Sequence, residues 1–259
     1  MSTISKSRTL GMLIFILSVL SINIILILSQ IFEFKELPVP GNYFKDIKIY
    51  DAGDALRDKQ GLTDDGFVIP YIDGTTSISR LGRVFPNNLI FKPLMIFCGF
   101  LICIFWSNQK KLLSCFIINE KLLKKMYFCG LITGVFLIIH ITFLGVKIDN
   151  NFYKLFIRLI LGLCVLFGIY TKILFVNNVK IILKKKLLKN NIYFKIQYYL
   201  VYILLIILLI SIFLALMGIP KTYILIIEWN YYVAIFVFYF LYFLSWRSYS
   251  FIQPPPKTL

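Results

Sequence analysis

The residues of this chain best suited to chemistry lie in a polar stretch, residues 75–91, that leads directly into an apolar segment. The candidate residues in this stretch are Ser77, Ser79, Arg80, Gly82 and Arg83. Hydroxyl groups and planar guanidinium groups suit recognition of a phosphate or carboxylate, and a glycine lets the backbone approach a ligand or make a turn. At a membrane surface, this set predicts a site for a lipid head group. The pattern also fits arginines that face lipid phosphates generally, without selecting one lipid.

Glu228 is an acidic residue beside an apolar segment, where a charge is costly and often functional. We expect Glu228 to lie near residues 77–83 and to pair with Arg80 or Arg83. A glutamate that is exposed to water near the interface, with a structural role only, is the alternative.

His140 is the only histidine in the chain, and it lies within an apolar segment. A polar side chain in such a place commonly hydrogen-bonds a neighbouring helix. The sharper alternative is a proton relay or a general base. With Ser77 or Ser79 and with Glu228, it would make an intramembrane enzyme for acyl transfer or hydrolysis. That alternative requires the three groups to converge.

Composition places these residues in a membrane protein. The chain has 259 residues, 59% of them hydrophobic, and its mean hydropathy is +0.82. Soluble domains are about 45–50% apolar. Here the excess lies in runs of roughly twenty residues, which as helices cross about 30 Å of hydrocarbon. The composition argues against a soluble enzyme and predicts an all-α integral membrane protein with six transmembrane helices.

The six apolar runs define the expected organisation of a single membrane domain, residues 1–259. The predicted spans cover about residues 10–31, 89–106, 126–146, 153–176, 198–217 and 222–246. The first run exceeds the roughly 7–15 apolar residues of a signal peptide, so we expect it to be retained. Residues 32–86, about 55 residues, form an extracytoplasmic loop that we expect to pack as a cap on the helix ends.

Charge predicts the orientation of these spans. The net charge is +16, and fifteen Lys and Arg residues lie in the termini and in loops 107–125 and 177–197. Nine of the twelve acidic residues lie between Glu33 and Asp73, within the long loop. The positive-inside rule therefore places both termini in the cytoplasm. The rule also explains the basic composition without a nucleic-acid ligand. We therefore expect the binding partners to be membrane lipids, or a membrane protein, and we expect no binding of nucleic acid.

The cysteines and the histidine give no sign of a metal site or cofactor. The five cysteines include no CxxC pair, and none lies in residues 33–86. The single histidine excludes a bis-histidine haem within this chain. No G-x-S-x-G, H-E-x-x-H or glycine-rich phosphate loop is present. We expect no metal and no cofactor.

The stretch 75–91 carries a resemblance to a known family. Ser77-Ile78-Ser79, Gly82, Pro86 and Phe91, together with Glu228-Trp229 before a tyrosine- and phenylalanine-rich segment, resemble the pattern of the Frag/DRAM/Sfk family. This family includes the lipid-remodelling factors that act after GPI attachment and the membrane region of the fungal Cwh-type remodelling protein. The resemblance implies one span, an outer loop, five further spans and a role in handling membrane lipids. Unlike some family members, the chain has no histidine near the start of the fourth span.

The sequence thus favours a multi-pass membrane protein that handles or organises membrane lipids, with a head-group site on the outer side. An intramembrane lipid-modifying enzyme is the first alternative. A transporter or a non-catalytic membrane scaffold is the second, although few charges lie within the spans.

Overall fold

The computed structural model describes residues 3–31, 69–83, 86–116, 119–146, 151–185 and 191–247, and these residues form helices and turns. The long helices are α1 (Thr3–Ile31), α5 (Asn87–Ser114), α6 (Glu120–Phe143), α7 (Asn151–Lys184), α8 (Ile192–Leu216) and α9 (Lys221–Ser245). Two short helices, α3 (Pro70–Asp73) and α4 (Ile78–Arg83), precede α5. The predicted all-α fold is confirmed. Most of the expected cap loop, residues 32–68, lies outside the described residues.

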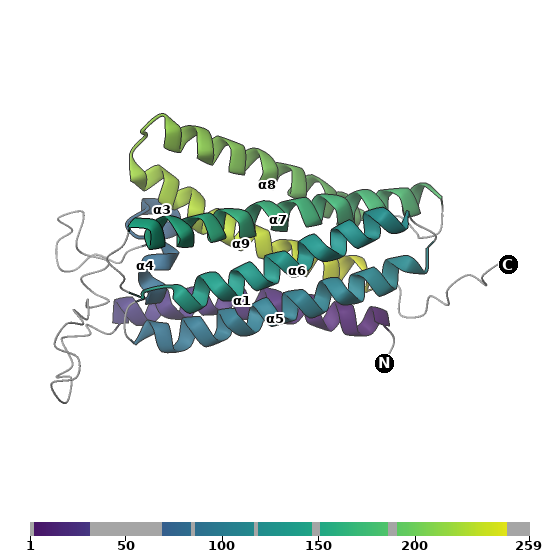
Figure 1. Cartoon of the computed structure of the whole chain (residues 1–259), viewed down its shortest axis with the longest axis horizontal. Coiled ribbons are helices and arrows are strands. Elements are labelled where there is room, and N and C mark those ends of the chain that lie inside the picture. The colour runs from purple at the N-terminus through teal and green to yellow at the C-terminus, as the bar shows by residue number, and fades with distance from the viewer. Residues whose placement is uncertain are drawn as a thin grey trace.

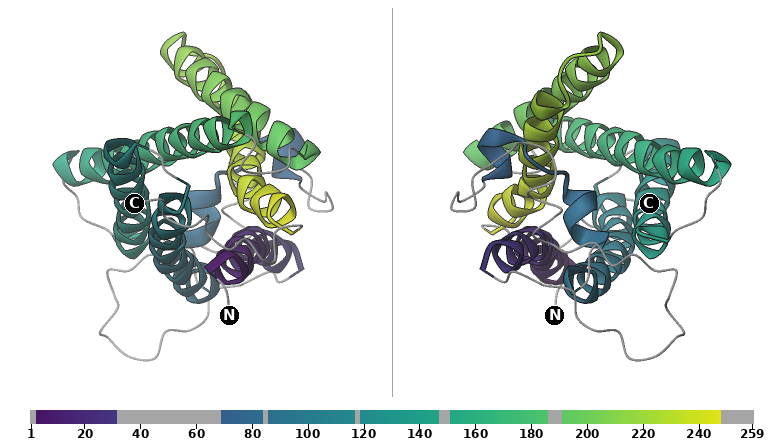
Figure 2. Two further views of the ribbon diagram at one scale, coloured as in Figure 1. Left: turned by 90° about the vertical axis from the view of Figure 1, so that its right-hand side faces the viewer. Right: turned by 90° about the vertical axis from the view of Figure 1, so that its left-hand side faces the viewer.

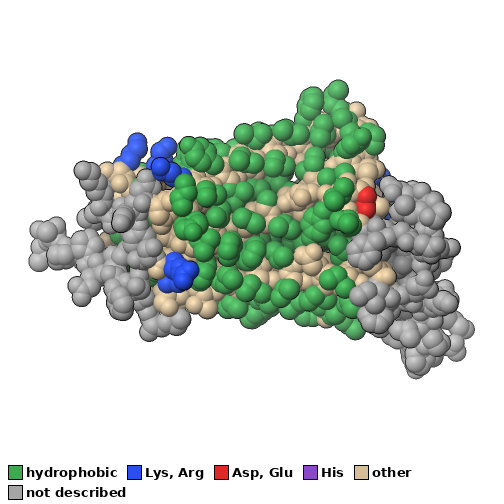
Figure 3. Space-filling view, turned by 180° about the vertical axis from the view of Figure 1, so that it is seen from behind, with side chains coloured by type: hydrophobic (Ala, Val, Ile, Leu, Met, Phe, Trp, Pro, Cys, Tyr) green, Lys and Arg blue, Asp and Glu red, His purple; other side chains and the backbone are tan. Residues whose placement is uncertain are grey.

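Within the described residues, six helices are long and apolar enough to cross a membrane, namely α1 and α5 to α9. The chain is therefore a multi-pass membrane protein by the length and composition of its helices. Several helices run past the apolar runs of the sequence, as α7 does in continuing to Lys184. Hydropathy detects only the apolar part of a helix, which suits hydrocarbon. Helical turns that carry lysines beyond this part are therefore predicted as loop from the sequence. Figure 3 shows a broad band of hydrophobic side chains across the bundle.

The helices pack in a closed order in which α1, α5, α6, α7, α8 and α9 each contact the next and α9 returns to α1 (Figure 1). The start of α1 and the end of α9 lie at one end of the bundle, which we call the terminal end. The short helices α3 and α4 lie at the opposite end, which we call the α4 end. An even number of spans is expected to bring the start of the first span and the end of the last to the same end of the bundle, as is the case here.

Helix α8 differs from the other spans because it is the least buried of the six. It meets α7 and α9 near the terminal end and diverges from α7 toward the α4 end (Figures 1 and 2). Exposed isoleucine and leucine side chains follow one another along it. In a membrane these side chains face lipid, where apolar surface is not penalised.

The tightest helix contact described joins α5 and α6 through glycines. A Cβ atom on Gly134 would lie 2.8 Å from the carbonyl oxygen of Gly99, and one on Gly130 would lie 2.6 Å from Cδ1 of Trp106. Small residues let membrane helices approach closely, and Gly130 and Gly134 have the G-x-x-x-G spacing typical of such contacts. The G-x-x-x-G spacing of Gly130 and Gly134 is the signal in the sequence for this contact.

Aromatic rings fill the centre of the bundle between α5, α7 and α9. Phe105 packs edge-to-face on Tyr239 and Tyr242, with ring centroids 5.1 and 4.9 Å apart. Trp106 and Phe175 lie in the same cluster, with their centroids 6.0 Å apart. Such pairs contribute about 0.5–1.5 kcal/mol each beyond the burial of their area. They join three helices that are distant in sequence.

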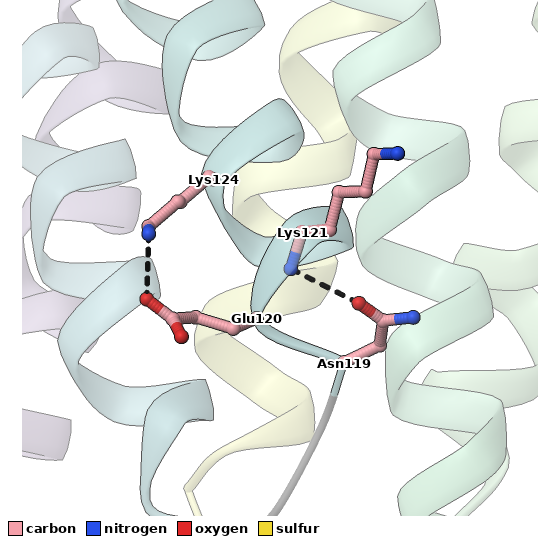
Figure 4. A network of polar contacts seen from close by, with 4 residues as sticks. All are labelled: Asn119, Glu120, Lys121 and Lys124. Atoms are coloured by element: carbon pink, nitrogen blue, oxygen red, sulfur yellow. Dashed lines mark hydrogen bonds and ion pairs between the residues drawn. The ribbon is translucent and has the colours of Figure 1, made fainter.

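Asparagine side chains cap two helices at the terminal end. The side chain of Asn119 accepts a hydrogen bond from the backbone N–H of Lys121, and Glu120 pairs with Lys124 at 2.7 Å (Figure 4). Asn191 caps α8 by accepting from the N–H of Phe194, and it also donates to the carbonyl of Ser245 in α9. These caps satisfy amides that the first turn of a helix leaves free.

Candidate lipid head-group site at the α4 end

Residues 69–83, which we call the strap, cross the α4 end and position most of the predicted site residues. The strap contains α3, a turn at Gly74 and α4. It packs on α9 through α3, and on α1 and α5 through α4. Ile78, Leu81 and Gly82 face inward and are buried. The strap is thus held on three sides by spans.

Glu228 binds the backbone of α4. Its Oε1 accepts a hydrogen bond from the N–H of Ile78, the first residue of α4, at 3.2 Å. The predicted nearness of Glu228 to residues 77–83 is therefore present, with a different partner from the arginines expected. Among the described residues, Glu228 forms no ion pair with Arg80 or Arg83. The first amides of a helix need acceptors and carry partial positive charge, which favours a carboxylate.

The serines complete this cap. The side-chain oxygen of Ser77 accepts from the N–H of Arg80 at 3.1 Å, which is the usual N-cap bond to the third helical residue. Ser77 and Ser79 also share a hydrogen bond, with their hydroxyl oxygens 3.2 Å apart. Ser77 therefore caps α4, and the part of Ser77 and Ser79 in binding a head group stays a prediction.

Trp229 and Asn230 form hydrogen bonds with the first half of the strap, which contains α3 and the turn after it. The indole N–H of Trp229, which is fully buried, donates to the carbonyl of Thr76 at 2.7 Å. Its ring packs edge-to-face on Tyr71, with centroids 4.9 Å apart. The amide of Asn230 donates to the carbonyl of Tyr71 at 2.8 Å. Three consecutive residues of α9 therefore hold α3, the following turn and α4.

Tyr71 extends these bonds to α1. Its hydroxyl donates to the side-chain oxygen of Asn23 at 3.3 Å. Burial raises the pKa of the Tyr71 phenol, and the bond to Asn23 offsets part of that rise. The phenol therefore stays protonated and acts as a donor at any physiological pH.

Gly74 turns the strap where it touches α9. Its φ is +61°, in the left-handed region that favours glycine. A Cβ atom there would collide with the carbonyl oxygen of Thr222 and lie 3.0 Å from Cγ1 of Ile226. Both the backbone conformation and the close approach therefore require glycine.

Gly82 and Asn87 join the strap to α5 and α1. A Cβ atom on Gly82 would meet the ring of Phe91 at 2.5 Å, so this glycine serves close packing. The amide of Asn87 donates to Ser29 Oγ at 2.7 Å and to the carbonyls of Ile25 and Leu81 at 3.3 Å. Asn87 is the first residue of α5, which begins after Pro86 without a side-chain cap.

Arg80 and Arg83 lie one turn apart on α4. Arg80 is partly buried, while Arg83 is exposed. Arg83 also lies against the turn that follows α6, because its Cβ would be 2.8 Å from a Cβ on Gly145. The two guanidinium groups are therefore carried by a helix that contacts or is bonded to α1, α5, α9 and the turn after α6.

His140 lies elsewhere, between α6 and α7. It is 6% exposed, and Nδ1 lies 3.4 Å from the carbonyl oxygen of Ile157. This contact matches the interpretation of a polar side chain that joins neighbouring helices. In the described part of the chain, no hydrogen bond joins His140 to Ser77, Ser79 or Glu228. The residues of the proposed enzyme are therefore not linked as a catalytic set.

Lys172 is a buried cation that the sequence analysis did not single out, because it lies within an otherwise apolar run. It is 3% exposed, and its ammonium nitrogen lies 5.5 and 5.3 Å from the ring centroids of Phe238 and Tyr239. The nitrogen also donates to the carbonyl of Gly168 at 3.4 Å. Of the described side chains, no acidic one pairs with it. A lysine within an apolar run is the signal that would have identified it.

The described residues do not bring together three His, Cys, Asp or Glu side chains in a way that would hold a metal ion. The α4 end carries two guanidinium groups on an anchored helix, and guanidinium groups suit a phosphate or carboxylate.

Replacing Glu228 by alanine is expected to release the start of α4. The N–H group of Ile78 would lose its acceptor, at about 1–3 kcal/mol for a buried donor left unpaired. Amide hydrogen exchange at residue 78 should accelerate about tenfold or more. Glu228→Gln keeps an acceptor oxygen and should behave close to wild type. Equal exchange in the alanine variant and wild type would contradict this role.

Comparison with known proteins adds no relative, since no family model, no curated protein and no solved structure matches the chain.

Proposed function

We propose that the protein binds the anionic head group of a membrane lipid at the α4 end through Arg80 and Arg83. The observation that supports the proposal is that the acidic and the basic side chains at this site have different roles. The Glu228 carboxylate is engaged by the backbone of α4, and the exposed Arg83 lies on the same anchored helix. Guanidinium groups held by a rigid element bind phosphate with less loss of entropy than groups on a free loop.

The resemblance of residues 77–91 and Glu228-Trp229 to the Frag/DRAM/Sfk family supports a lipid as the ligand. We propose that the chain is a divergent member of this group. The two segments that carry the resemblance are those that meet at the strap, where Glu228 bonds α4 and Trp229 bonds Thr76. If the contact between these two segments positions α4, this role would explain why the chain contains both of them.

The orientation belongs to the same proposal, with the α4 end outside the cytoplasm and the terminal end inside. Cys115 is exposed and ends α5 at the terminal end, and Ile72 is 73% exposed on α3 at the α4 end. In sealed vesicles with the cytoplasmic face outward, an impermeant maleimide should label Cys115 directly. An Ile72→Cys, Cys115→Ser variant should be labelled only after detergent is added. The reverse pattern would invert the orientation.

Removing both arginines is expected to weaken lipid binding at least tenfold. A charge-assisted hydrogen bond contributes about 1.5–3 kcal/mol, and about 1.4 kcal/mol is a factor of ten. Native mass spectrometry of the purified protein, titrated with phosphatidylinositol and with phosphatidylcholine, would measure the loss in Arg80→Ala/Arg83→Ala. Lys121→Ala/Lys185→Ala is the matched control, because it removes two exposed lysines from the terminal end. Equal binding by the two double variants would refute the site.

A further inference from the structure

Four buried polar side chains lie inside the bundle, between its aromatic cluster and the terminal end. They come from four different spans, and each is at most 2% exposed: Ser7 of α1, Gln109 of α5, Asn178 of α7 and Ser245 of α9. We call these four residues the polar layer. In the described part of the chain, one side-chain atom of each has no hydrogen-bond partner, namely Oγ of Ser7, Oε1 of Gln109, Nδ2 of Asn178 and Oγ of Ser245.

The aromatic cluster fixes the level of the polar layer on α5 and α9. The rings of Phe105 and Tyr242 pack with their centroids 4.9 Å apart. Gln109 lies four residues after Phe105, and its amide nitrogen donates to the hydroxyl of Tyr242 at 2.9 Å. Ser245 lies three residues after Tyr242, on the same side of α9. Both polar residues are therefore about one helical turn nearer the terminal end than the two rings.

The same level is found on α7 and α1. Asn178 lies three residues after Phe175, whose ring centroid is 5.7 Å from that of Tyr242. Ser7 lies four residues before Gly11, where an added Cβ atom would be 3.2 Å from Cδ1 of Tyr242. Helix α7 runs toward the terminal end and α1 runs away from it (Figure 1). Asn178 and Ser7 are therefore also about one turn nearer the terminal end than the rings.

The serines of the polar layer differ from other buried serines of the bundle. Ser18, Ser21 and Ser29 of α1 donate to backbone carbonyls three or four residues earlier in their own helix. The hydroxyls of Ser7 and Ser245 make no such bond within the described residues. Buried polar atoms in proteins are bonded to protein or to ordered water, and each one left unpaired costs about 1–3 kcal/mol. Four such atoms at one level favour a bound molecule that pairs with them.

The chemistry of the four atoms defines the class of this molecule. The amide oxygen of Gln109 accepts, the amide nitrogen of Asn178 donates, and the two hydroxyls do both. All four side chains are uncharged. Arg8, the cation that follows Ser7, lies over the ring of Phe243, with 5.3 Å between its guanidinium carbon and the ring centroid. A small neutral molecule that both donates and accepts hydrogen bonds fits this set, and water is the smallest.

We propose that the polar layer binds water inside the bundle, donated to by Asn178 and donating to Gln109. One buried water makes about three hydrogen bonds, so four atoms correspond to about one or two molecules. The site uses no residue of the strap, and it stands whether or not Arg80 and Arg83 bind a head group. It places ordered water beside the aromatic cluster, among side chains that are closed to bulk solvent.

Hydroxyl-radical labelling by X-ray radiolysis of the protein in nanodiscs tests this site. Radicals formed from bound water oxidise the side chains beside it, even where bulk solvent does not reach. Tyr242 is the reporter, and Tyr239, about one turn deeper on α9, is the reference, since both are at most 1% exposed. Mass spectrometry of wild type should show Tyr242 oxidised at least fivefold faster than Tyr239. Equal rates for the two tyrosines would overturn the proposal.

Two double variants assign the water to the polar layer. Ser7→Ala/Ser245→Ala removes two partners of the water, and the ratio of the two rates should fall below twofold. Ser18→Ala/Ser21→Ala is the matched control, because it removes two buried serines that bond their own helix, and it should keep the fivefold ratio. Fraying of the end of α9 would expose Tyr242 equally in both. The same ratio in the two double variants would therefore also overturn the proposal.

Discussion

Replacing Gly130 with alanine is expected to destabilise the bundle by about 1–3 kcal/mol, the range of overpacked cores. The added methyl group would press on the Trp106 side chain close to its attachment to the backbone, where rotation gives little relief. Trp106 is 1% exposed and packs on Phe105 and Phe175, so it has no free space to enter. The strain therefore separates α5 from α6 or disturbs the aromatic centre.

Gly162 provides a control within the same chain. A Cβ atom on Gly162 meets nothing within 4 Å, although this residue also lies within a span. Gly162→Ala should leave stability unchanged or raise it by up to about 1 kcal/mol, because alanine is the better helix former. Unfolding in mixed detergent micelles would compare the two variants. Similar stabilities for Gly130→Ala and Gly162→Ala would contradict this prediction. They would show that the α5–α6 contact accommodates the added methyl group without a loss of stability.

Lys172→Met is expected to leave the bundle at least as stable as wild type, whereas Lys172→Ala should destabilise it by about 2–5 kcal/mol. Methionine keeps most of the length of the side chain and makes favourable contacts with Phe238 and Tyr239. It also removes a buried ammonium, whose desolvation opposes folding even when aromatic faces attract it. Alanine removes the charge as well but leaves a cavity.

The same unfolding assay would report on both Lys172 variants, with loss of Trp fluorescence as the signal. If Lys172→Met is as unstable as Lys172→Ala, the ammonium itself holds α7 to α9 through the two rings. If methionine is neutral or stabilising, Lys172 contributes its volume to folding and its charge is open to another role.

The fold was largely predictable, because hydropathy and length are properties of single segments. Six apolar runs predicted six spans, and the structure has α1 and α5 to α9 in those places. The partners of each helix were not predictable in this way. The contact of α1 with α9 and the divergence of α8 depend on which side chains interlock, and composition does not record that.

The site was predicted in part. The charge of Glu228 and its place at the start of a span predicted that it lies near residues 77–83, and it bonds Ile78 there. The sequence could not show that its partner is backbone, because the need for an acceptor arises only once α4 forms a short helix. Gly82 illustrates the same limit, since its role against Phe91 depends on a contact between α4 and α5.

The strap also has a consequence for the order of synthesis. Its residue Ile78 is bonded to Glu228, 150 positions later in the chain. At about 5–20 residues per second, a ribosome needs roughly 8–30 s to make that stretch. During this time the strap lacks the three α9 residues that hold it, so the α4 end reaches its final arrangement only after the last span has been made.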